Sequence, residues 1–402
     1  MKSTVAVIGG GASGMLAALT AAETESQKVI LFERQARIGR KLMATGNGRC
    51  NFTNTGASVS NYHGAEPAFV RPVLEKLPPR KILEIFSELG LLCVEQYGGR
   101  VYPLSDSAGS VLDVLRFALQ SAGVEIHLSE PILSVSCNKG KFEIHSAESE
   151  YTADYLIIAC GGKAGGKIGG VGDGYDLLKS LGHHCSKLYP ALVPIRTDTD
   201  YPRSLKGIRA EAKVSLYSGE YLQAEGTGEL QFTENGISGP AAFDISREAS
   251  VNGGKVTIDF LRDLSESEVA EMLVRRKKLT PNLENSNFFT GILQSRLGLV
   301  LVKYSGLRPS EIIGDMNTKQ IWELAHSAKN FEMNVKGTDS FDNAQVTAGG
   351  ILTKEFVPET LESRLNKHLF ACGEVLDIDG DCGGYNLQWA WASGYTAGRL
   401  GK

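Results

Sequence analysis

The sequence lacks the cysteine pairs that mark a secreted or dithiol-redox protein. Its seven cysteines are an odd number scattered through 402 residues, and none of them forms a C-x-x-C pair. This argues against a disulfide framework and excludes the usual dithiol redox motif. His183, His184 and Cys185 are adjacent, but their spacing matches no zinc-binding pattern. We expect a reduced protein without a metal site.

Long hydrophobic runs are also missing. The stretch from Val5 to Ala22 is apolar enough to mimic a signal peptide, but four glycines and a nucleotide-binding motif lie inside it. No other run reaches the ~18 residues of a membrane span. We therefore expect a cytoplasmic protein with no membrane partner.

A strong excess of one charge is absent as well. The chain has 42 Lys and Arg against 46 Asp and Glu, a net charge of −4, so its overall charge does not indicate nucleic acid or an anionic membrane as a partner. Local basic clusters occur at residues 275–278 and at Arg203, Lys206 and Arg209. Such clusters can bind phosphates, but they are more often solvated faces.

Glycine, in contrast, is abundant and concentrated in motifs. It makes up 46 of 402 residues, roughly 11 % against ~7 % in average proteins. Gly9, Gly11 and Gly14 fill the pattern G-x-G-x-x-G between an apolar β-branched run, 4–8, and a run of helix formers, 15–22. The first glycine permits a tight turn, the second lets the backbone approach a pyrophosphate, and the third lets helix and strand pack closely. The helix N-terminus then offers N–H groups to the phosphates.

Glu33 completes this nucleotide-binding pattern. It ends a second apolar strand, 28–32, and lies 19 residues after Gly14. That spacing is close to the ~20 residues expected for the acid that binds a ribose 2′-OH. The sequence therefore predicts a dinucleotide site in an α/β domain.

Two further stretches extend this site. The polar, basic loop 34–54 has no helical or strand period, and such a loop beside a nucleotide site usually surrounds the ligand. Near the C-terminus, the glycine-rich residues 372–386 precede a helix with many small residues. This indicates a second helix N-terminus that faces a ligand.

The rest of the chain predicts a discontinuous architecture. Residues 131–155 alternate like a β-meander, 190–262 look β-rich, and 264–330 look helical with Ser265 as an N-cap. The predicted domains are an α/β Rossmann-like domain formed by 1–189 and 344–402, an inserted β-rich domain formed by 190–263 and 331–343, and a small helical domain at 264–330.

Short motifs spread over nearly the whole chain carry a family resemblance. They are Gly39-Arg40-Lys41, Thr45 to Asn51, Gly172 to Tyr175, Phe232-Thr233, Gly236 to Pro240, Ala348 to Gly350, and Gly383 to Ala390. Together they resemble FAD-binding oxidoreductases of the glutathione-reductase-like class, and most closely the BaiN/RdsA-type (aminoacetone-oxidase-like) flavoproteins. Residues 163–168 depart from that family, in which a serine-aromatic-proline run is common.

The resemblance implies an FAD domain interrupted by a β-barrel-like domain and a small helical domain. It implies that Glu33 binds the adenosine ribose, that the glycine turn binds the pyrophosphate, and that 40–51 and 373–388 surround the flavin. The full set of implied cofactor-binding residues is Gly9, Gly11, Ala12, Ser13, Gly14, Glu33, Arg34, Gly39, Arg40, Lys41, Thr45, Gly46, Asn47, Gly48, Arg49, Cys50, Asn51, Ile132, Gly161, Gly162, Gly373, Glu374, Gly383, Gly384, Tyr385, Asn386 and Gln388.

The resemblance also implies that NAD(P)H reduces FAD and that hydride then passes to an acceptor. No second strand–G-x-G-x-x-G–helix unit occurs in the middle of the chain, so we expect NAD(P)H to visit the flavin without a Rossmann domain of its own. The candidates for the proton donor are Cys50, Cys382, Tyr97, Tyr102 and Tyr385, with Cys382 and Tyr385 preferred.

Four functions fit these features. We favour an NAD(P)H-dependent reductase of an activated C=C bond in a steroid-like or bile-acid-like enone or another small molecule. The second is reduction of uridine to dihydrouridine in ribosomal RNA. The others are an amine oxidase that yields H₂O₂ and a flavin-bound RNA-binding or sensor protein with little turnover. The sequence does not give the oligomeric state.

Overall fold

The computed structural model describes residues 2–402 and divides them into two compact units. The first unit is formed by the residues up to Tyr189 together with Gln345–Lys402, and the second by Pro190–Ala344. Each unit has its own core of buried hydrophobic side chains. No helix within residues 2–402 is long and apolar enough to span a membrane.

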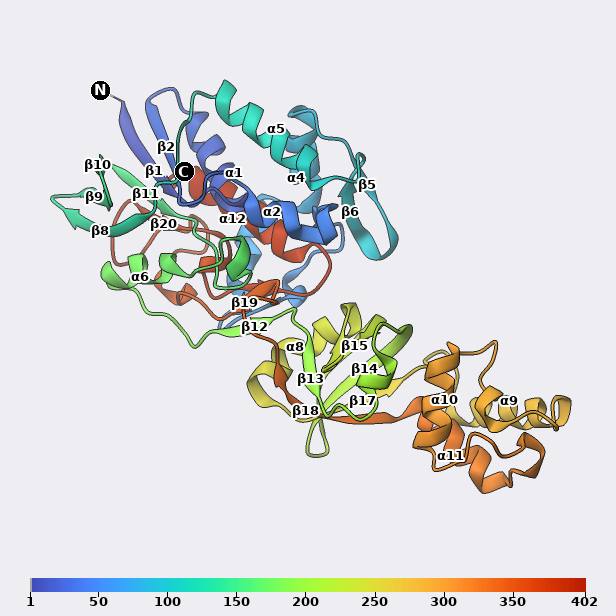
Figure 1. The fold of residues 1–402 in the computed structure, drawn as a ribbon. Helices are drawn as coiled ribbons and strands as arrows, with labels where there is room; N and C mark the ends of the chain where they lie inside the picture. Colours follow the sequence, from blue (N-terminus) through green and yellow to red (C-terminus); the bar gives the residue numbers. More distant parts are fainter. Residues whose placement is uncertain (1) are drawn as a thin grey trace. The chain divides into compact units, whose positions relative to one another are not determined.

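A five-stranded parallel sheet forms the centre of the first unit (Figure 1). Its strand order is β20-β11-β1-β2-β7. All four neighbouring pairs are parallel, as expected when crossover connections and not hairpins join the strands. The strands are β1 (Ser3–Ile8), β2 (Gln27–Glu33), β7 (Glu125–Leu128), β11 (Tyr155–Ile158) and β20 (Leu369–Ala371).

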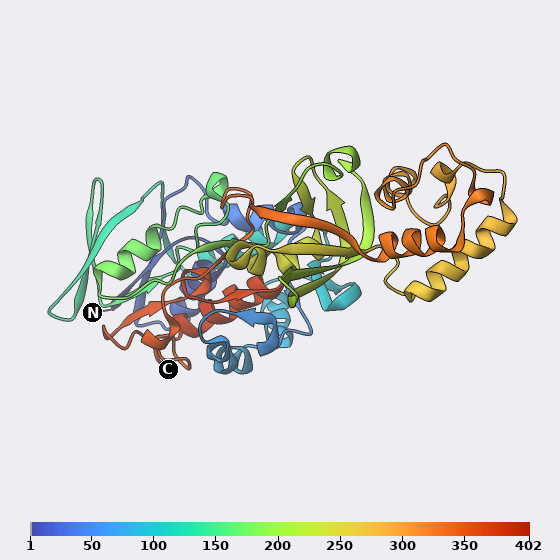
Figure 2. The same cartoon turned by 90° about the horizontal axis from the view of Figure 1, so that it is seen from below.

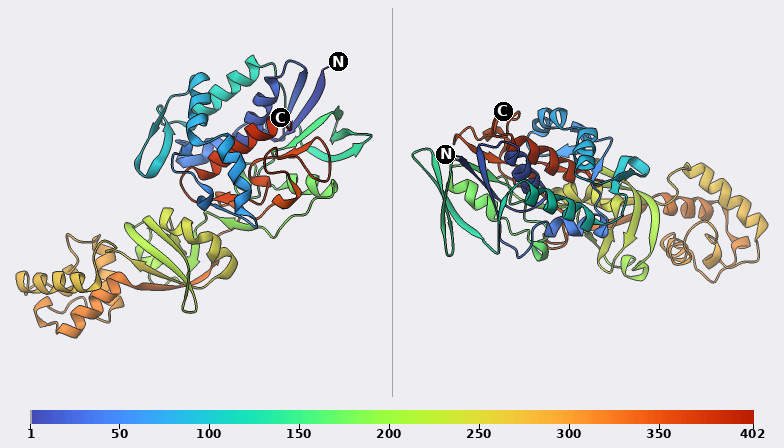
Figure 3. Two further views of the ribbon diagram at one scale, coloured as in Figure 1. Left: turned by 180° about the vertical axis from the view of Figure 1, so that it is seen from behind. Right: turned by 90° about the horizontal axis from the view of Figure 1, so that it is seen from above.

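Two helices from opposite ends of the sequence pack against each other in this unit (Figure 3): α1 (Ala12–Ala22) and α12 (Tyr385–Gly398). Glycines permit the close approach. A Cβ on Gly394 would lie 2.3 Å from the carbonyl oxygen of Ser13, and one on Gly398 would lie 2.5 Å from that of Ala17. The small residues of the last helix therefore serve helix packing.

Smaller elements surround the sheet. The predicted β-meander is present as β8, β9 and β10, and a second antiparallel sheet has the order β3-β6-β5. The elements are α2 (Arg40–Ala44), β3 (Thr53–Asn54), β4 (Tyr62–His63), α3 (Arg71–Lys76), α4 (Pro79–Glu88), β5 (Cys93–Glu95), β6 (Arg100–Pro103), α5 (Ala108–Ser121), β8 (Ile132–Asn138), β9 (Lys141–Ser146), β10 (Glu150–Ala153), α6 (Asp173–Ser180), β19 (Val346–Ala348) and β21 (Asp379–Gly380).

The second unit contains a closed barrel of strand order β13-β16-β15-β14-β17-β18. Figure 2 shows β18 in orange running from the helices of this unit along the barrel. The elements are β12 (Tyr189–Ala191), where the chain enters the unit, β13 (Ile195–Thr197), α7 (Pro202–Leu205), β14 (Arg209–Ser218), β15 (Tyr221–Phe232), β16 (Gly236–Ser238), α8 (Pro240–Asn252), β17 (Lys255–Asp259), α9 (Glu266–Leu279), α10 (Ser295–Tyr304), α11 (Thr318–Lys329) and β18 (Phe331–Thr338).

The fold confirms the predicted class, a Rossmann-type parallel sheet with a β-meander and an inserted barrel. Ser265 is the N-cap of α9, and its side chain accepts a hydrogen bond from Glu268 N. One expectation was incomplete, because α8 interrupts the region expected to be β-rich. This helix starts with Pro240 at its first turn, where the missing N–H costs nothing. Its buried residues, Ala241, Ala242, Ile245 and Ala249, follow helical spacing.

Candidate functional site

In the glycine turn between β1 and α1, two glycines pack against neighbouring backbone and the third faces open space. Gly9 has φ +110°, and a Cβ there would lie 2.4 Å from the carbonyl oxygen of Ala159. A Cβ on Gly14 would lie 1.8 Å from the carbonyl oxygen of Gly9, whereas one on Gly11 would meet nothing within 4 Å. Gly9 and Gly14 are thus required for packing, and Gly11 faces open space that a ligand can enter.

The N-terminus of α1 is available for an anion. Gly11 is the N-cap and supplies no side chain to cap the helix. The first intrahelical bond runs from Met15 N to Gly11 O, at 2.9 Å. The N–H groups of the first turn are therefore directed out of the helix with the positive end of its dipole. Ala12 and Ser13 belong to this turn, and a Cβ on Gly373 would lie 2.5 Å from Ser13 Oγ.

Glu33 lies at the end of β2, beside this turn. Its Oε2 accepts a hydrogen bond from Gly10 N and its Oε1 accepts one from Gln35 N, both at 2.8 Å. Burial raises the pKa of the Glu33 carboxyl above its usual value, and the two backbone donors oppose the shift. Each carboxylate oxygen can accept more than one hydrogen bond, so Glu33 retains capacity for ribose hydroxyls.

The basic residues of the following loop pair with protein groups. Arg34 forms an ion pair with Asp173 at 2.8 Å. Arg40 Nη1 donates to Gln35 Oε1 at 2.7 Å on the surface. Lys41 Nζ forms an ion pair with Glu374 Oε2 at 2.6 Å. Only the Lys41 pair joins two segments that the sequence predicted to surround the flavin.

The carboxylate of Glu374 connects several segments of the chain. Its Oε1 accepts a hydrogen bond from Thr347 N at 2.8 Å, and the Thr347 hydroxyl oxygen accepts from Lys163 N and Ala164 N. A Cβ on Gly162 would lie 2.4 Å from Glu374 Oε1. Gly162 therefore has to be glycine for this carboxylate to fit, while the neighbouring Gly161 has φ +72° with open space around it.

The segment from Gly39 to Asn51, which was expected to be a loop, contains the short helix α2, and its backbone is irregular on both sides of this helix. Left-handed φ values occur at Gly39 (+69°), Gly46 (+56°), Asn47 (+57°), Gly48 (+87°) and Cys50 (+63°). Such a run of left-handed residues is costly outside glycine and is typical of functional loops. Thr45 closes α2 by donating from Oγ1 to Leu42 O at 2.6 Å.

Arg49 and Cys50 differ sharply in exposure. Arg49 Nε forms an ion pair with Asp106 at 2.6 Å, and its guanidinium carbon lies 4.3 Å from the centroid of the Tyr102 ring. Cys50 is fully buried, and burial raises the pKa of its thiol to about 12. Burial therefore makes Cys50 a poor proton donor, because its thiol does not contact solvent.

The segment before α12 packs directly on this loop. Gly383 (φ +137°) and Gly384 (φ +99°) precede the helix, and a Cβ on Gly384 would lie 2.4 Å from Thr53 O and 2.8 Å from Asn51 Oδ1. Asn54 Nδ2 donates to Gly383 O at 2.9 Å. Backbone segments more than 300 residues apart in sequence are thereby held together at the N-terminus of a helix.

Asn51 carries a buried acceptor that nothing satisfies. Its Oδ1 has no hydrogen-bond partner within residues 2–402. A buried unsatisfied oxygen is rare in native proteins and often marks a missing ligand group. The ring N–H and ribityl hydroxyls of a flavin are donors of the required kind. Together with the open turn at Gly11, this acceptor fits an FAD molecule along the predicted segments.

Two predicted cofactor residues instead make protein contacts. Gln388 is fully buried; its Oε1 accepts from Thr53 Oγ1 at 2.6 Å and its Nε2 donates to Leu77 O at 2.9 Å. Asn386 accepts from Gly380 N and donates to Gly380 O. These contacts do not support cofactor binding by the two amides, which hold the segment in place. Ile132, at the start of β8, is buried in the core.

The remaining predicted donors lie in different surroundings. Tyr97, in the hairpin turn between β5 and β6, is 99 % exposed. Tyr102 lies under Arg49 and is nearly buried. Tyr385 and Cys382 are half-buried beside the two glycines, and the backbone oxygen of Tyr385 accepts from the Tyr62 hydroxyl at 3.0 Å.

A histidine–aspartate pair lies beside these residues and was not predicted. His63 Nε2 lies 2.7 Å from Asp381 Oδ1. The pair forms because β4 and β21, two residues each, are hydrogen-bonded neighbours. His63 falls outside every motif, and its only sequence signal is the position of Asp381 inside the C-terminal glycine stretch.

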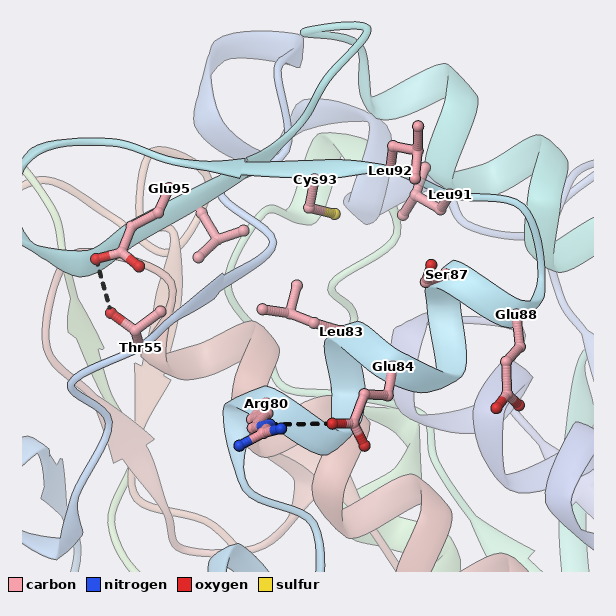
Figure 4. A pocket seen from close by; sticks show the side chains of 11 residues that line it. Thr55, Arg80, Leu83, Glu84, Ser87, Glu88, Leu91, Leu92, Cys93 and Glu95 are labelled. Carbon is pink, nitrogen blue, oxygen red and sulfur yellow. Dashed lines mark hydrogen bonds and ion pairs between the residues drawn. The ribbon is translucent and has the colours of Figure 1, made fainter.

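A surface hollow lies elsewhere in the first unit. It measures about 620 Å³ and is lined by α4, β5 and neighbouring residues, with the pairs Arg80–Glu84 and Thr55–Glu95 at its rim (Figure 4). None of the predicted cofactor-binding residues lines it. Its position offers no reason to move the candidate site away from the glycine turn.

The two histidines of the His-His-Cys triplet bind the same carboxylate, that of Glu355. His183 is buried, its Nδ1 lies 3.0 Å from Glu355 Oε2, and its Nε2 lies 3.0 Å from Ser363 Oγ. His184 Nδ1 lies 2.7 Å from Glu355 Oε1. Residues 2–402 contain no group of three or more His, Cys, Asp or Glu side chains placed to hold a metal ion.

The sequence is similar to a family of Rossmann-domain proteins and to two enzymes with named activities. The sequence profile described as the HI0933-like protein Rossmann domain matches residues 3–400. The 3-dehydro-bile acid delta(4,6)-reductase of Clostridium scindens is 40 % identical over 401 residues, which cover 98 % of each chain. The ribosomal RNA dihydrouridine synthase of Haemophilus influenzae is 28 % identical over 396 residues, which cover 97 % of this chain and 96 % of that protein.

A solved structure of similar extent is the 3-ketosteroid delta1-dehydrogenase of Sterolibacterium denitrificans. It is 13 % identical, each chain is covered to 99 %, and the TM-score is 0.48.

Proposed function

Because the chain belongs to the HI0933-like Rossmann-domain family, we propose that it is an FAD-dependent oxidoreductase that reduces a C=C bond conjugated with a carbonyl group. The observation that carries this proposal is the convergence of three segments on one site. The open turn at Gly11, the loop ending at Asn51 and the glycines before α12 all meet in the first unit. The close approaches of Gly373 to Ser13 and of Gly384 to Asn51 connect these segments, which supports the binding of one extended dinucleotide along them.

The chain's own residues take the following roles in this proposal. The first turn of α1 binds the pyrophosphate with backbone N–H groups, and Glu33 binds the adenosine ribose. Asn51 Oδ1 and the N-terminus of α12 contact the flavin, where the helix dipole favours negative charge on the ring. FAD, when bound, supplies two-electron hydride chemistry. The Lys41–Glu374 ion pair and the Gln388–Thr53 hydrogen bond hold these segments in place relative to one another.

NAD(P)H is the reductant that we assign to this enzyme. The described chain contains one glycine turn of the dinucleotide-binding type, in the first unit. A bound FAD would fill that turn. NAD(P)H therefore has to reach the flavin from outside, without a binding domain of its own.

The names of the relatives, and the chemistry that their two reactions share, support the substrate class that we propose. The bile acid reductase relative acts, by its name, on a 3-dehydro-bile acid, and we assign a small cyclic enone to this chain on that basis. Hydride adds to the carbon β to the carbonyl group, and a proton adds to its neighbour. The same chemistry converts uridine into dihydrouridine, which makes RNA the second candidate.

One structural observation favours the RNA candidate. Arg275 and Glu271 line a hollow of about 310 Å³ together with Trp322, which is 44 % exposed. Arg275 and the nearby Lys278 on α9 form no ion pair with any residue among 2–402. An exposed aromatic ring beside unpaired cations is the pattern with which proteins bind single-stranded nucleic acid.

The experiment is anaerobic reduction of the purified protein by NADH and by NADPH, followed at the flavin absorbance band. A 3-keto steroid with conjugated double bonds and a ribosomal RNA fragment are then added in separate runs. We expect bleaching by a nicotinamide and reoxidation by the steroid. Reoxidation by RNA alone would move the proposal to the second candidate. A protein that neither nucleotide bleaches would contradict the assignment of NAD(P)H.

A further inference from the structure

The pair formed by His63 and Asp381 has a defined geometry. His63 Nε2 lies 2.7 Å from Asp381 Oδ1, and the second carboxylate oxygen accepts from Asn61 Nδ2 at 3.1 Å. Asp381 N also donates to Asn61 O at 3.0 Å. Both oxygens of the aspartate are thus engaged, so the carboxylate is fixed and can fix the imidazole. An aspartate that holds one ring nitrogen sets the tautomer and orientation of the other.

The backbone around the pair is held equally firmly. β4 and β21 pair antiparallel, with Gly380 opposite Tyr62 and Asp379 opposite His63. Asn386 hydrogen-bonds both the N–H and the carbonyl of Gly380, and its Nδ2 also donates to Asp381 O. The first turn of α12 therefore positions the strand that carries the aspartate.

The pair lies next to the residues that we assign to the flavin. Asp381 is separated from Gly383 by Cys382 alone. Gly383 receives a hydrogen bond from Asn54, and Gly384 packs on Asn51 and Thr53. The side chains of His63 and Asp381 keep 39 % and 33 % of their surface exposed. The imidazole therefore lies beside a segment that we assign to the flavin and is open to water, which a proton donor needs.

Three other acidic groups near the site, Cys50, Tyr62 and Tyr102, are less suited to give a proton, and Cys382 and Tyr385 are the alternative donors. Burial raises the pKa of the Cys50 thiol to about 12. Burial also raises the pKa of the Tyr62 hydroxyl, which donates to the backbone oxygen of Tyr385. Tyr102 is covered by Arg49. A half-exposed histidine with a carboxylate partner is the group whose ordinary chemistry matches proton transfer near neutral pH.

We propose that His63 is the proton donor of the reaction and that Asp381 is the positioning residue that holds its ring. This inference rests on the proposed function. Hydride adds to the β-carbon, the C=C π bond breaks, and its electron pair is left on the α-carbon and carbonyl oxygen. The imidazolium N–H bond then breaks and its proton forms the new C–H bond at the α-carbon. The two electrons come from NAD(P)H, which is oxidised, and water returns the proton to the imidazole.

The test separates the two half-reactions in the FAD-loaded protein. The variants are His63→Gln and Asp381→Asn, with His145→Gln as the matched control. His145 is 37 % exposed, lies 3.4 Å from Glu150 in the β-meander, and has no place in the site. We expect flavin content and reduction by NAD(P)H to stay within twofold of wild type in all three. Reoxidation by the steroid enone should fall at least ~10²-fold in His63→Gln and less in Asp381→Asn.

A second readout does not depend on turnover. The protein has seven histidines, and ¹⁵N-histidine spectra are recorded as the steroid enone is added. The His63 ring resonances should move on binding, and those of His145 should not.

The outcomes distinguish the two proposals. If the wild-type protein transfers no hydride to the enone, the proposed function is refuted, and the role of His63 is refuted with it. Wild-type turnover with an unchanged reoxidation rate in His63→Gln overturns only the inference. Equal slowing of both half-reactions, or an unmoved His63 resonance in the enone complex, also overturns it, because His63 would then be a structural residue.

Discussion

Gly384 lies so close to Thr53 that a Cβ at position 384 would be 2.4 Å from the Thr53 carbonyl oxygen. This contact joins the loop that follows α2 to the start of α12. It also places the unsatisfied Oδ1 of Asn51 beside the N-terminus of that helix. The candidate flavin site therefore depends on a contact between residues 331 positions apart in the sequence.

We expect Gly384→Ala to lose FAD. The substitution adds a contact that no real Cβ makes, and φ +99° is itself unfavourable for alanine, by roughly 1–2 kcal/mol. The loop and the helix must then separate. Flavin content after purification and the midpoint of thermal unfolding measure the effect.

The control is Gly123→Ala, where φ is +70° and no atom lies within 4 Å of the new Cβ. That variant has backbone strain without a clash and should keep its flavin. Equal flavin content in the two variants would show that the contact between Gly384 and Thr53 does not shape the site.

Gly11→Val and Gly14→Val should fail in different ways. The valine at position 11 enters open space at φ −79°, so the protein should fold and have the secondary structure of wild type. It should contain no FAD, because the side chain occupies the path of the pyrophosphate. The valine at position 14 collides with Gly9 O, so that variant should be strongly destabilised. Circular dichroism and flavin absorbance separate the two outcomes. A folded, yellow Gly11→Val protein would contradict the phosphate assignment.

Cys50 should be inert toward alkylation. Its thiol is fully buried with a pKa of about 12, whereas Cys137 is exposed on β8. Brief treatment of the native protein with iodoacetamide near pH 8 should modify Cys137 and leave Cys50 intact, as read by peptide mass spectrometry. Cys50→Ser should reduce the enone at a rate within a few-fold of wild type. A hundredfold loss of the rate of enone reduction in Cys50→Ser, without loss of flavin, would instead indicate that the thiol is the proton donor.

The buried His183 should make the first unit less stable in acid. Burial lowers the pKa of its imidazole from 6.5, so the unfolded chain binds a proton that the folded chain refuses. The stability that this neutral histidine contributes is present above pH 6.5 and is lost as the pH falls toward its folded pKa. Burial raises the pKa of its partner Glu355, but hydrogen bonds from His184 and His183 together outweigh burial and lower this pKa below 4.5, so the contribution of Glu355 is lost only at lower pH.

The free energy of unfolding of the apo-protein should therefore fall between pH 7 and pH 5, and fall less in His183→Gln. Tryptophan fluorescence in a Trp322→Phe background reports on the first unit, which then holds both remaining tryptophans, Trp389 and Trp391. His145→Gln serves as the surface control. An identical pH dependence in His183→Gln and wild type would exclude this histidine as the cause.

The sequence predicts those parts of the molecule in which local residues determine local structure. The glycine turn and the Ser265 cap are of this kind, because each depends on residues a few positions apart. The helix α8 was missed because its start signal, Pro240, lies within a region whose strands dominate the pattern. The direction in which a side chain points could not be predicted from the sequence either. Gln388 lies in a cofactor motif, but packing turns its amide toward Thr53 and Leu77.

The His63–Asp381 pair shows why long-range contacts escape such predictions. The two residues are 318 positions apart, and only the pairing of β4 with β21 brings them together. Neither strand is longer than two residues, so neither produces a periodic signal. The sequence predicts which segments surround the flavin, and only the fold brings His63 next to one of them.

A single turnover with one acceptor tests the central claim most directly. The FAD-loaded protein is reduced under argon with one equivalent of dithionite, so that the result does not depend on the choice of nicotinamide. One equivalent of a 3-keto steroid with conjugated double bonds is then added. We predict that the oxidised flavin band returns in full and that the steroid gains two hydrogens by mass spectrometry. A flavin that stays reduced until air is admitted, with the steroid recovered unchanged, would contradict the proposal that this protein reduces enones.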